Sequence, residues 1–377
     1  MSNKEIFYGD NLRLARLMAG ISLNDLGERI GATRQYIHKL ETTDKKLPIN
    51  DLVRALAFEL NVETNFFSLS IGNQVKEEEC HFRKLKSTLV SSRRECIARA
   101  TLLNKLIDTL EEYLTLPEIN FPQHEANALL DIEQIAKKCR KHWGLGDGPI
   151  KNMIRVVENA GAIVSTFGGV SEKVDALSIQ RSRPIILLNA TKSAARIRMD
   201  IAHETAHIIL HKGIETGDSE TESQANHFAS LFLLPQQALL QEYTSRSQTR
   251  LDWKAITSIK IKWGISTKAI IYRLHQSGII SPSQFRKANI HLSKTGQTKN
   301  EYYDERIPND LPELLPTSLS LLGKSYGASF GGLLKELCIK PNFLAELTQT
   351  EDIIESIMAE ENSSGNVTSI NAYRRIN

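Results

Sequence analysis

Two histidines lie four residues apart, with a glutamate directly after the first, in a segment that has the apolar pattern of a buried helix. The three residues are His203, Glu204 and His207. Because residues four apart share one face of a helix, the two imidazoles can converge on one metal ion. Glu204 lies beside them, where it can take a proton from a water activated by the ion and pass it to a leaving amine. The spacing therefore predicts a zinc hydrolase with two histidine ligands and a glutamate as general base.

A catalytic zinc also needs a third protein ligand and an open fourth position. A second helix is expected to begin after Asp218 and to end at Pro235. Glu222 lies in its first or second turn and can lean across to the first helix, whereas Glu220 is too close to the helix start to share that face. Glu222 is therefore the predicted third ligand, and Glu220 is the alternative.

Two more residues are expected close to these ligands. Asn226 lies one turn after Glu222 on the same face, where it can accept a hydrogen bond from the second ring nitrogen of His203 and fix the tautomer. His211 lies one turn beyond His207, about 6 Å further along the helix axis. We expect His211 to be a helix-end histidine near unpaired carbonyls rather than a ligand.

The motif helix needs a scaffold, and the preceding sequence predicts one. Helical patterns are followed by three short apolar runs separated by polar turns, which predict a small antiparallel sheet packed against helices. An exposed edge strand of such a sheet can pair with an extended peptide and hold its carbonyl over the metal. The predicted helices cover residues 129–143, 150–159 and 193–210, and the predicted strands cover 162–167, 175–179 and 184–189.

The first 67 residues carry a different pattern, that of four short amphipathic helices. Ser22 and Thr33 are suitable N-caps, and Gly20 and Gly31 are suitable helix ends. Two short helices joined by a glycine turn are the arrangement that presents the second helix to a DNA major groove. This segment has nine basic and nine acidic side chains, so DNA binding would depend on local geometry and not on bulk charge.

The helix predicted at residues 34–41 is the candidate recognition helix. Ile37 and Leu40 are expected to face inward, which leaves the polar residues outward or at the leading end. Gln and Arg side chains can make bidentate hydrogen bonds to adenine and guanine edges, and Lys suits phosphates. The predicted DNA contacts are Ser22, Asn24, Arg34, Gln35, Tyr36, His38 and Lys39, with Lys45 and Lys46 in the following turn.

Residues 22–41 resemble the lambda repressor/Cro-like (Xre) helix-turn-helix family along their whole length. They read Ser-Leu-Asn-Asp-Leu-Gly-Glu-Arg-Ile-Gly-Ala-Thr-Arg-Gln-Tyr-Ile-His-Lys-Leu-Glu. The family usually has Gln at the position of Leu23, so the affinity or sequence preference is expected to differ. The resemblance implies a double-stranded DNA operator as partner, and dimerisation is expected from the symmetry of repressor operators.

A second stretch resembles the ImmA/IrrE family of bacterial metallopeptidases. It comprises Arg-Met-Asp-Ile-Ala-His-Glu-Thr-Ala-His-Ile-Ile-Leu-His at 198–211 and Glu-Ser-Gln-Ala-Asn-His-Phe-Ala-Ser-Leu-Phe-Leu-Leu-Pro at 222–235. The resemblance implies a gluzincin-type site that binds Zn²⁺ in a zincin-like domain. It also implies cleavage of a repressor protein in response to stress or DNA damage. This chain departs from the family at Gln224, where an acid is common.

Together these patterns predict a multidomain, mainly α fold. An all-α helix-turn-helix domain is followed by a helical connector, an α+β zincin-like metallopeptidase domain, a basic helical extension and a helical C-terminal region without recognisable chemistry. In the C-terminal region the helical patterns cover 318–322 and 332–347. The predicted bounds of the five segments are 1–67, 68–123, 124–250, 251–300 and 301–377.

The predicted basic extension is unevenly charged, with ten Lys or Arg against one acid between Arg250 and Lys299. A solvated helical face and a phosphate-contacting surface both fit this charge. A glycine turn at 264–267 gives a second helix-turn-helix-like spacing. In the peptidase family this region usually completes the fold, so we favour a structural role over a second DNA-reading element.

Composition limits the class of protein further. A chain of 377 residues with 41% hydrophobic content is long enough for two or three domains with cores of their own. No apolar stretch approaches a bilayer span and the N-terminus lacks an apolar signal core, so we expect a cytoplasmic protein without a membrane partner. The four cysteines form no C-x-x-C pair, which fits a reducing compartment and argues against a cysteine zinc site.

Three functional hypotheses follow. The first is a regulatory zinc endopeptidase fused to a DNA-binding domain, with a repressor or the chain itself as substrate. The second is a transcriptional regulator whose metal site is sensory or structural. The third is an antitoxin-like interaction protein whose zincin fold is only a scaffold. Replacing Glu204 by Gln would separate the first from the others, because only proteolysis needs the general base.

Overall fold

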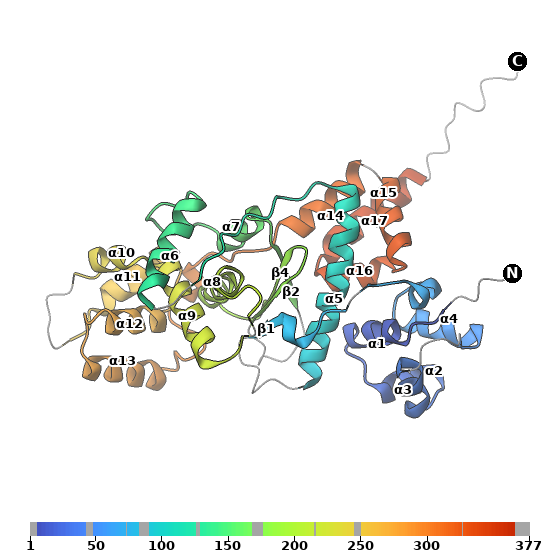
Figure 1. The fold of residues 1–377 in the computed structure, drawn as a ribbon, viewed down its shortest axis with the longest axis horizontal. Coiled ribbons are helices and arrows are strands. Elements are labelled where there is room, and N and C mark those ends of the chain that lie inside the picture. Colours follow the sequence, from blue (N-terminus) through green and yellow to red (C-terminus); the bar gives the residue numbers. More distant parts are fainter. Residues whose placement is uncertain are drawn as a thin grey trace, which may run out of the picture. The chain divides into compact units, whose positions relative to one another are not determined.

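The computed structural model describes residues 6–42, 48–72, 74–82, 90–125, 129–167, 176–214, 216–244, 250–325 and 327–365. These residues are mainly helical with one small sheet, as predicted (Figure 1). By its internal contacts the chain divides into a first unit, residues 1–75, 93–116 and 314–377, and a second unit, residues 76–92 and 117–313. The finer division into five segments stays a prediction. Among the described helices, none is both long and apolar enough to cross a membrane.

The N-terminal part of the first unit contains α1 (Gly9–Met18), α2 (Leu23–Ile30), α3 (Arg34–Thr42) and α4 (Asn50–Glu59), followed by a 3₁₀ helix at Thr64–Ser68. The Ser22 hydroxyl caps α2, and Gly31 ends it with a left-handed φ of 67°. A side chain at Gly27 would come within 2.6 Å of the Ala32 carbonyl oxygen, so only glycine allows the chain to fold back this closely. The helices α2 and α3 therefore follow each other across a glycine turn.

A buried ion pair fixes α3 against α1. Arg16 donates to the two carboxylate oxygens of Glu41 over 2.5 and 3.0 Å, and it also donates to the Ile21 carbonyl over 2.8 Å. The two charged side chains are less than a tenth exposed. Because a buried charge that loses its partner is costly, this pair holds α3 in one orientation.

The remainder of the first unit joins segments that are far apart in sequence: α5 (Val90–Tyr113), α14 (Leu314–Ser325), α15 (Gly327–Leu337), α16 (Pro341–Thr348) and α17 (Glu351–Gly365). Figure 1 shows α5 beside these C-terminal helices, and Arg99 of α5 donates to the carbonyls of Glu346 and Leu347 over 2.7 and 3.0 Å. The single helical pattern predicted at 332–347 is in fact two helices. Cys338 takes a left-handed φ of 53°, and Pro341 begins the next helix.

The sheet of the second unit contains β1 (Cys80–Phe82), β2 (Ile163–Phe167), β3 (Ala176–Gln180) and β4 (Pro184–Asn189), in the order β1-β3-β4-β2. The prediction of an antiparallel sheet is wrong for one pair, because β2 runs parallel to β4. The chain passes from β2 to β3 on the far side of β4 and then returns in β4 antiparallel to β3. Apolar runs predict strands but not their spatial order, so the sequence could not reveal this crossover.

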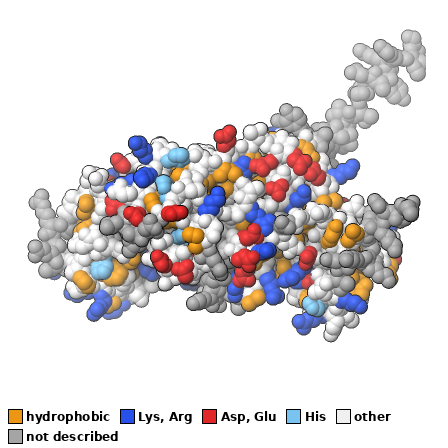
Figure 2. Space-filling view, in the orientation of Figure 1, with side chains coloured by type: hydrophobic (Ala, Val, Ile, Leu, Met, Phe, Trp, Pro, Cys, Tyr) orange, Lys and Arg blue, Asp and Glu red, His pale blue; other side chains and the backbone are white. Residues whose placement is uncertain are grey.

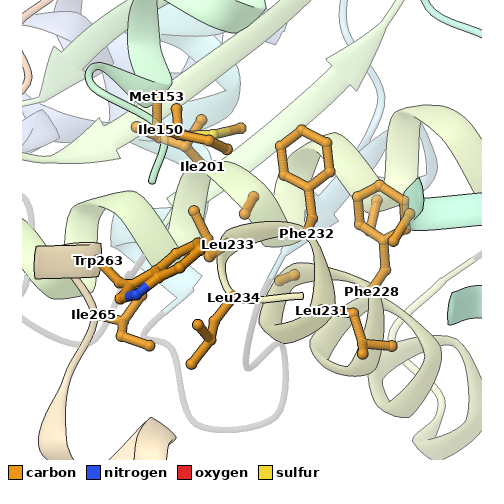
Figure 3. Packing of buried hydrophobic residues seen from close by; sticks show 14 of the residues in the cluster. Ile150, Met153, Ile201, Phe228, Leu231, Phe232, Leu233, Leu234, Trp263 and Ile265 are labelled. Atoms are coloured by element: carbon orange, nitrogen blue, oxygen red, sulfur yellow. The ribbon is translucent and has the colours of Figure 1, made fainter. Parts of the chain in front are cut away.

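The second unit also contains α6 (Leu129–His142), α7 (Met153–Asn159), α8 (Ala194–Leu210), α9 (Ser219–Leu233) and α10 (Gln236–Glu242), of which α7 and α8 contact the sheet. The helix α8 runs between the sheet and α9, with contacts to β3 and β4 on one side (Figure 1). Aromatic rings close the core behind it, since Phe232 stacks on Phe228 at 5.4 Å and meets Trp143 edge-on at 5.7 Å. Figure 3 shows Phe228 and Phe232 with further core residues from neighbouring elements.

Three more helices, α11 (Trp253–Trp263), α12 (Thr267–Gln276) and α13 (Pro282–Lys294), share this core with α8 and α9. Figure 3 shows Trp263 and Ile265 among the buried residues of this core. Two basic residues of this region are buried: Lys260 donates to Glu301 and Asp304 over 2.6 Å each, and Arg273 donates to the carbonyls of Ser230 and Leu234. For these two side chains the structural role holds, because neither can reach a phosphate.

Candidate metal centre

The helix α8 carries the motif and buries it completely. His203, Glu204 and His207 are exposed by 0, 0 and 1%. Their positions on one helix face place the Nε2 atoms of the two histidines 3.1 Å apart. Burial on both sides by the sheet and α9 fixes these side chains in one arrangement, as a metal or catalytic site requires.

The helix α9 brings a carboxylate to the same point. Its first turn is held by Asp218, which accepts from the backbone amides of Glu220 and Thr221. Glu222 then places one oxygen 3.5 Å from Nε2 of His203 and the other 3.4 Å from Nε2 of His207. Its side chain is 24% exposed, so the group opens to solvent on the glutamate side. The alternative ligand Glu220 lies outside this group and instead accepts from Gln224.

These three residues form a group of metal-ligating atoms that all lie within 4.8 Å of one another. Two imidazole nitrogens and one carboxylate, with an open side, are the donor set of a catalytic zinc site.

The hydrogen bonds behind His203 determine which nitrogen faces the centre. Nδ1 of His203 lies 3.2 Å from Oδ1 of Asn226, the contact expected from the sequence, and Asn226 in turn donates to the Glu222 carbonyl over 2.8 Å. An amide oxygen only accepts, so Nδ1 carries the proton and Nε2 presents a lone pair. This is the tautomer that a metal ligand needs.

A second chain of contacts does the same for His207. Nδ1 of His207 lies 2.9 Å from Nδ1 of His211, whose Nε2 lies 2.8 Å from Oε1 of Gln224. The amide oxygen places the His211 proton on Nε2, so His211 accepts at Nδ1 and His207 donates from its own Nδ1. Both Nε2 lone pairs therefore point at the same place, beside a carboxylate. A metal cation would satisfy both lone pairs and the carboxylate, so the residues fit a bound metal.

His211 thus does more than the sequence indicated. It ends α8, as expected, and its backbone amide donates to the His207 carbonyl over 3.0 Å. Its ring is not a partner of unpaired carbonyls but the link between His207 and Gln224. Burial lowers the pKa of His211, which keeps the imidazole neutral and able to accept. The spacing of four residues from His207 to His211 carried this information, because it places both rings on one face.

One carboxylate oxygen of Glu204 contacts the sheet. The hydroxyl of Ser178 on β3 donates to Oε2 of Glu204 over 2.5 Å. Ser178 is completely buried, and no sequence pattern marked it. The contact places the predicted general base between the metal-ligating group and strand β3.

A cavity of about 450 Å³ lies next to the centre, between α8, α9, α12 and α13. Asn226 lines it, so the residue that contacts His203 is also reachable from this cavity. Met199, Tyr272 and Phe285 provide apolar walls, and Arg196 and Lys268 provide positive charge. The cavity has room for a side chain or a small molecule beside Asn226.

The cysteines contribute nothing to this centre. Cys80, Cys96 and Cys139 are buried and form no disulfide, and Cys338 is half-buried. Burial raises the pKa of Cys139 to about 12, so its thiol remains protonated and unsuited to a metal.

The predicted DNA-contacting residues lie elsewhere, in the first unit. Arg34, Gln35, Tyr36, His38 and Lys39 are all exposed on α3, while Ile37 is buried and Leu40 is 9% exposed. Figure 2 shows basic side chains and a histidine on the surface formed by α3. Asn24 is exposed on α2, and Ser22 is engaged as its N-cap. Lys45 and Lys46 lie outside the described residues.

The comparison with family models agrees with the metal centre. Residues 158–275 match the IrrE N-terminal-like domain, a peptidase family numbered M78. The matched segment holds β2, β3, β4, α8 and α9, and therefore His203, His207 and Glu222. It covers under a third of the chain and does not extend to residues 1–157. The comparison with curated proteins gave no match. The resemblance of residues 22–41 to a helix-turn-helix family stays a prediction.

Proposed function

We propose that this chain is a zinc-dependent endopeptidase joined to a DNA-binding helix-turn-helix domain, and that it cleaves a repressor-type protein, or itself, to control gene expression. One observation carries the proposal. His203, His207 and Glu222 converge with their lone pairs on one point, beside Glu204, in a segment similar to a peptidase domain. A structural zinc site would be closed by four protein ligands, whereas this group offers three and an open side.

Each residue of the site has a separate role in the proposed reaction. When zinc is bound, it supplies a Lewis acid that polarises the scissile carbonyl and acidifies a water molecule. Glu204 takes the proton of the attacking water and returns it to the leaving amine. Ser178 holds the Glu204 carboxylate in one orientation, and Asn226 and His211 hold the two histidines in the tautomers that bind metal.

The DNA-binding part of the proposal is supported by the exposed face of α3. The glycine turn at Gly31 and the buried pair of Arg16 with Glu41 fix α3 while its polar residues stay open to a partner. Gln35 and Arg34 are at the leading end of this helix, where base contacts in a major groove are deepest. We propose a double-stranded operator as partner and a homodimer as the binding form.

The decisive experiment compares the wild type with Glu204→Gln, a change that keeps the shape of the side chain and removes the base. Each protein is co-expressed with the products of the neighbouring genes, with and without DNA damage, and all proteins are sized by mass spectrometry. We expect a shortened protein only with the wild type, and equal zinc content in both. Equal cleavage in both strains, or zinc bound with no cleavage under any inducer, would favour a sensory metal site.

A further inference from the structure

The sheet edge nearest the candidate general base is already paired by another part of the same chain. Strand β1, from the connector between α4 and α5, runs antiparallel to β3. Cys80 lies opposite Ile179, His81 opposite Ser178, and Phe82 opposite Leu177. The other side of β3 is taken by β4. β1 therefore fills the side of β3 to which an extended peptide could otherwise add.

This edge is linked directly to the site of the proposed reaction. Ser178, which lies opposite His81, donates its hydroxyl to Glu204. Neighbouring strands are about 4.8 Å apart, so the β1 backbone runs one strand spacing from the residue that orients the general base. A substrate segment that added to β3 would need the same backbone hydrogen bonds. β1 and such a segment therefore cannot pair with this edge of β3 at the same time.

An ion pair anchors the start of β1. Glu79, which directly precedes the strand, receives a hydrogen bond from Arg181 over 2.7 Å and one from the Lys76 amide over 2.7 Å. Burial would raise the pKa of Glu79, but Arg181 and the Lys76 amide lower it, so the carboxylate is charged. The strand has three residues, at the short limit for strands in folded proteins. Pairing of this size can exchange with a competing segment.

We propose that β1 is an internal occupant of the peptide-binding edge of β3. An extended segment of the substrate pairs with β3 only when residues 80–82 leave, and the site is closed to it while they stay. Recognition on this edge goes through the backbone, so the substrate presents an unfolded, extended segment. The part that concerns cleavage rests on the proposed function, but the competition for the edge does not.

A disulfide trap tests whether β1 occupies this edge in solution. Ile179→Cys places a thiol opposite native Cys80, and directly opposed residues of an antiparallel pair are within disulfide reach. We expect mild oxidation of the full chain to join these two cysteines, as mapped by mass spectrometry of the digest. The matched control, Leu177→Cys, puts the thiol opposite Phe82 and should not be joined to Cys80. No bond in Ile179→Cys, or equal bonding in both variants, would overturn the proposal.

A binding experiment tests the competition. The probe is a fluorescent peptide with the sequence of residues 76–82 and blocked ends, added to zinc-loaded Glu204→Gln protein. His81→Pro removes a backbone donor from β1, and Glu79→Gln removes its ion pair without changing the backbone. We expect the peptide to bind at least tenfold tighter to His81→Pro, about threefold tighter to Glu79→Gln, and not at all to the oxidised trap. Equal affinity in all forms would refute the proposal.

Different results would contradict the peptidase function and the occupant role of β1. If no variant cleaves any protein but the peptide binds as expected, the peptidase function is wrong and the edge competition holds. If the wild type cleaves its substrate and His81→Pro cleaves no faster, with unchanged peptide binding, the occupant role is wrong and the peptidase function holds. Should His81→Pro fail to fold, Glu79→Gln and the disulfide trap decide the question.

Discussion

The hydroxyl of Ser178 lies 2.5 Å from Oε2 of Glu204, and both side chains are completely buried. This hydrogen bond joins strand β3 to α8, the helix that carries the two histidines of the candidate metal centre. It fixes the carboxylate that we propose as general base, and it makes the position of that base dependent on strand β3. Ser178 therefore links the pairing of β3 to the proton transfer that we propose for Glu204.

Ser178→Ala tests this link. Loss of the hydroxyl leaves a buried carboxylate oxygen without this donor, which costs stability by about 1–3 kcal/mol. We expect the rate of substrate cleavage to fall about tenfold or more, while zinc content is unchanged, since Ser178 touches no ligand.

Ser165→Ala is the matched control. Ser165 is a buried serine on β2 whose hydroxyl has no hydrogen-bond partner among the described residues. Its removal should leave cleavage and stability close to the wild type. If the two alanine variants were equally active, Ser178 would have no role in placing the base.

The second prediction concerns His211. Because its ring fixes the tautomer of His207, His211→Ala should weaken zinc binding about 10–100-fold. Affinity is measured by competition with a chelating dye. His227→Ala is the control, because His227 is a half-buried histidine of α9 outside the metal-ligating group. Similar zinc affinities for His211→Ala and the wild type would show that the contact does not orient His207.

The candidate ligand residues could be predicted from the sequence because their spacing within each helix places them on one face. His203 and His207 share a face at a spacing of four residues, and Glu222 follows on a helix whose start is marked by Asp218. Asn226 was found by the same argument. These relations are local, so one helix period is enough to derive them.

The residues that were missed depend on long-range packing. Ser178 reaches Glu204 only because β3 lies next to α8, and no apolar pattern specifies which strand borders a helix. The parallel pair of β2 and β4 and the addition of β1 to the edge were hidden for the same reason. His211 differs, because its spacing from His207 is visible in the sequence, but the spacing does not show whether the ring contacts His207 or the helix-end carbonyls.

The third prediction concerns metal removal. If zinc is the metal and binds only the folded chain, free zinc at a hundred times its dissociation constant adds about 2.7 kcal/mol of stability. For a unit of this size we expect the Tm to rise by about 5–10 °C on adding zinc to chelator-treated protein. Glu222→Ala should lose most of this shift. An unchanged Tm in the wild type would argue against a metal bound by these residues.

The fourth prediction concerns a buried ion pair that supports α8. Arg198 donates to Asp310 over 2.8 Å, and the two side chains are 4 and 3% exposed. Asp310 also accepts from the Met153 amide over 2.7 Å. Asp310→Ala leaves the guanidinium buried and without this partner, so we expect the free energy of unfolding to fall by about 3–5 kcal/mol.

Urea denaturation measures this change, and Glu313→Ala provides the comparison. Glu313 forms an ion pair with Arg155 in which both side chains are about half exposed. Water and salt screen such a pair, so its loss should hardly move the urea midpoint. Equal effects of the two substitutions would mean that burial of the Arg198 pair does not determine its contribution.

The last prediction separates a specific DNA contact from a general charge effect. Arg34 begins α3, whereas Arg54 lies on α4 with 74% of its side chain exposed. Each change to Ala removes one positive charge, but only Arg34 belongs to the face that we propose to enter a major groove. With a duplex selected by the wild type from a random library, Arg34→Ala should weaken binding by about 1–3 kcal/mol, or roughly 5–150-fold. Arg54→Ala should bind almost normally, because a distant charge contributes little at physiological salt. If both variants lost affinity equally, bulk charge and not α3 would account for the binding.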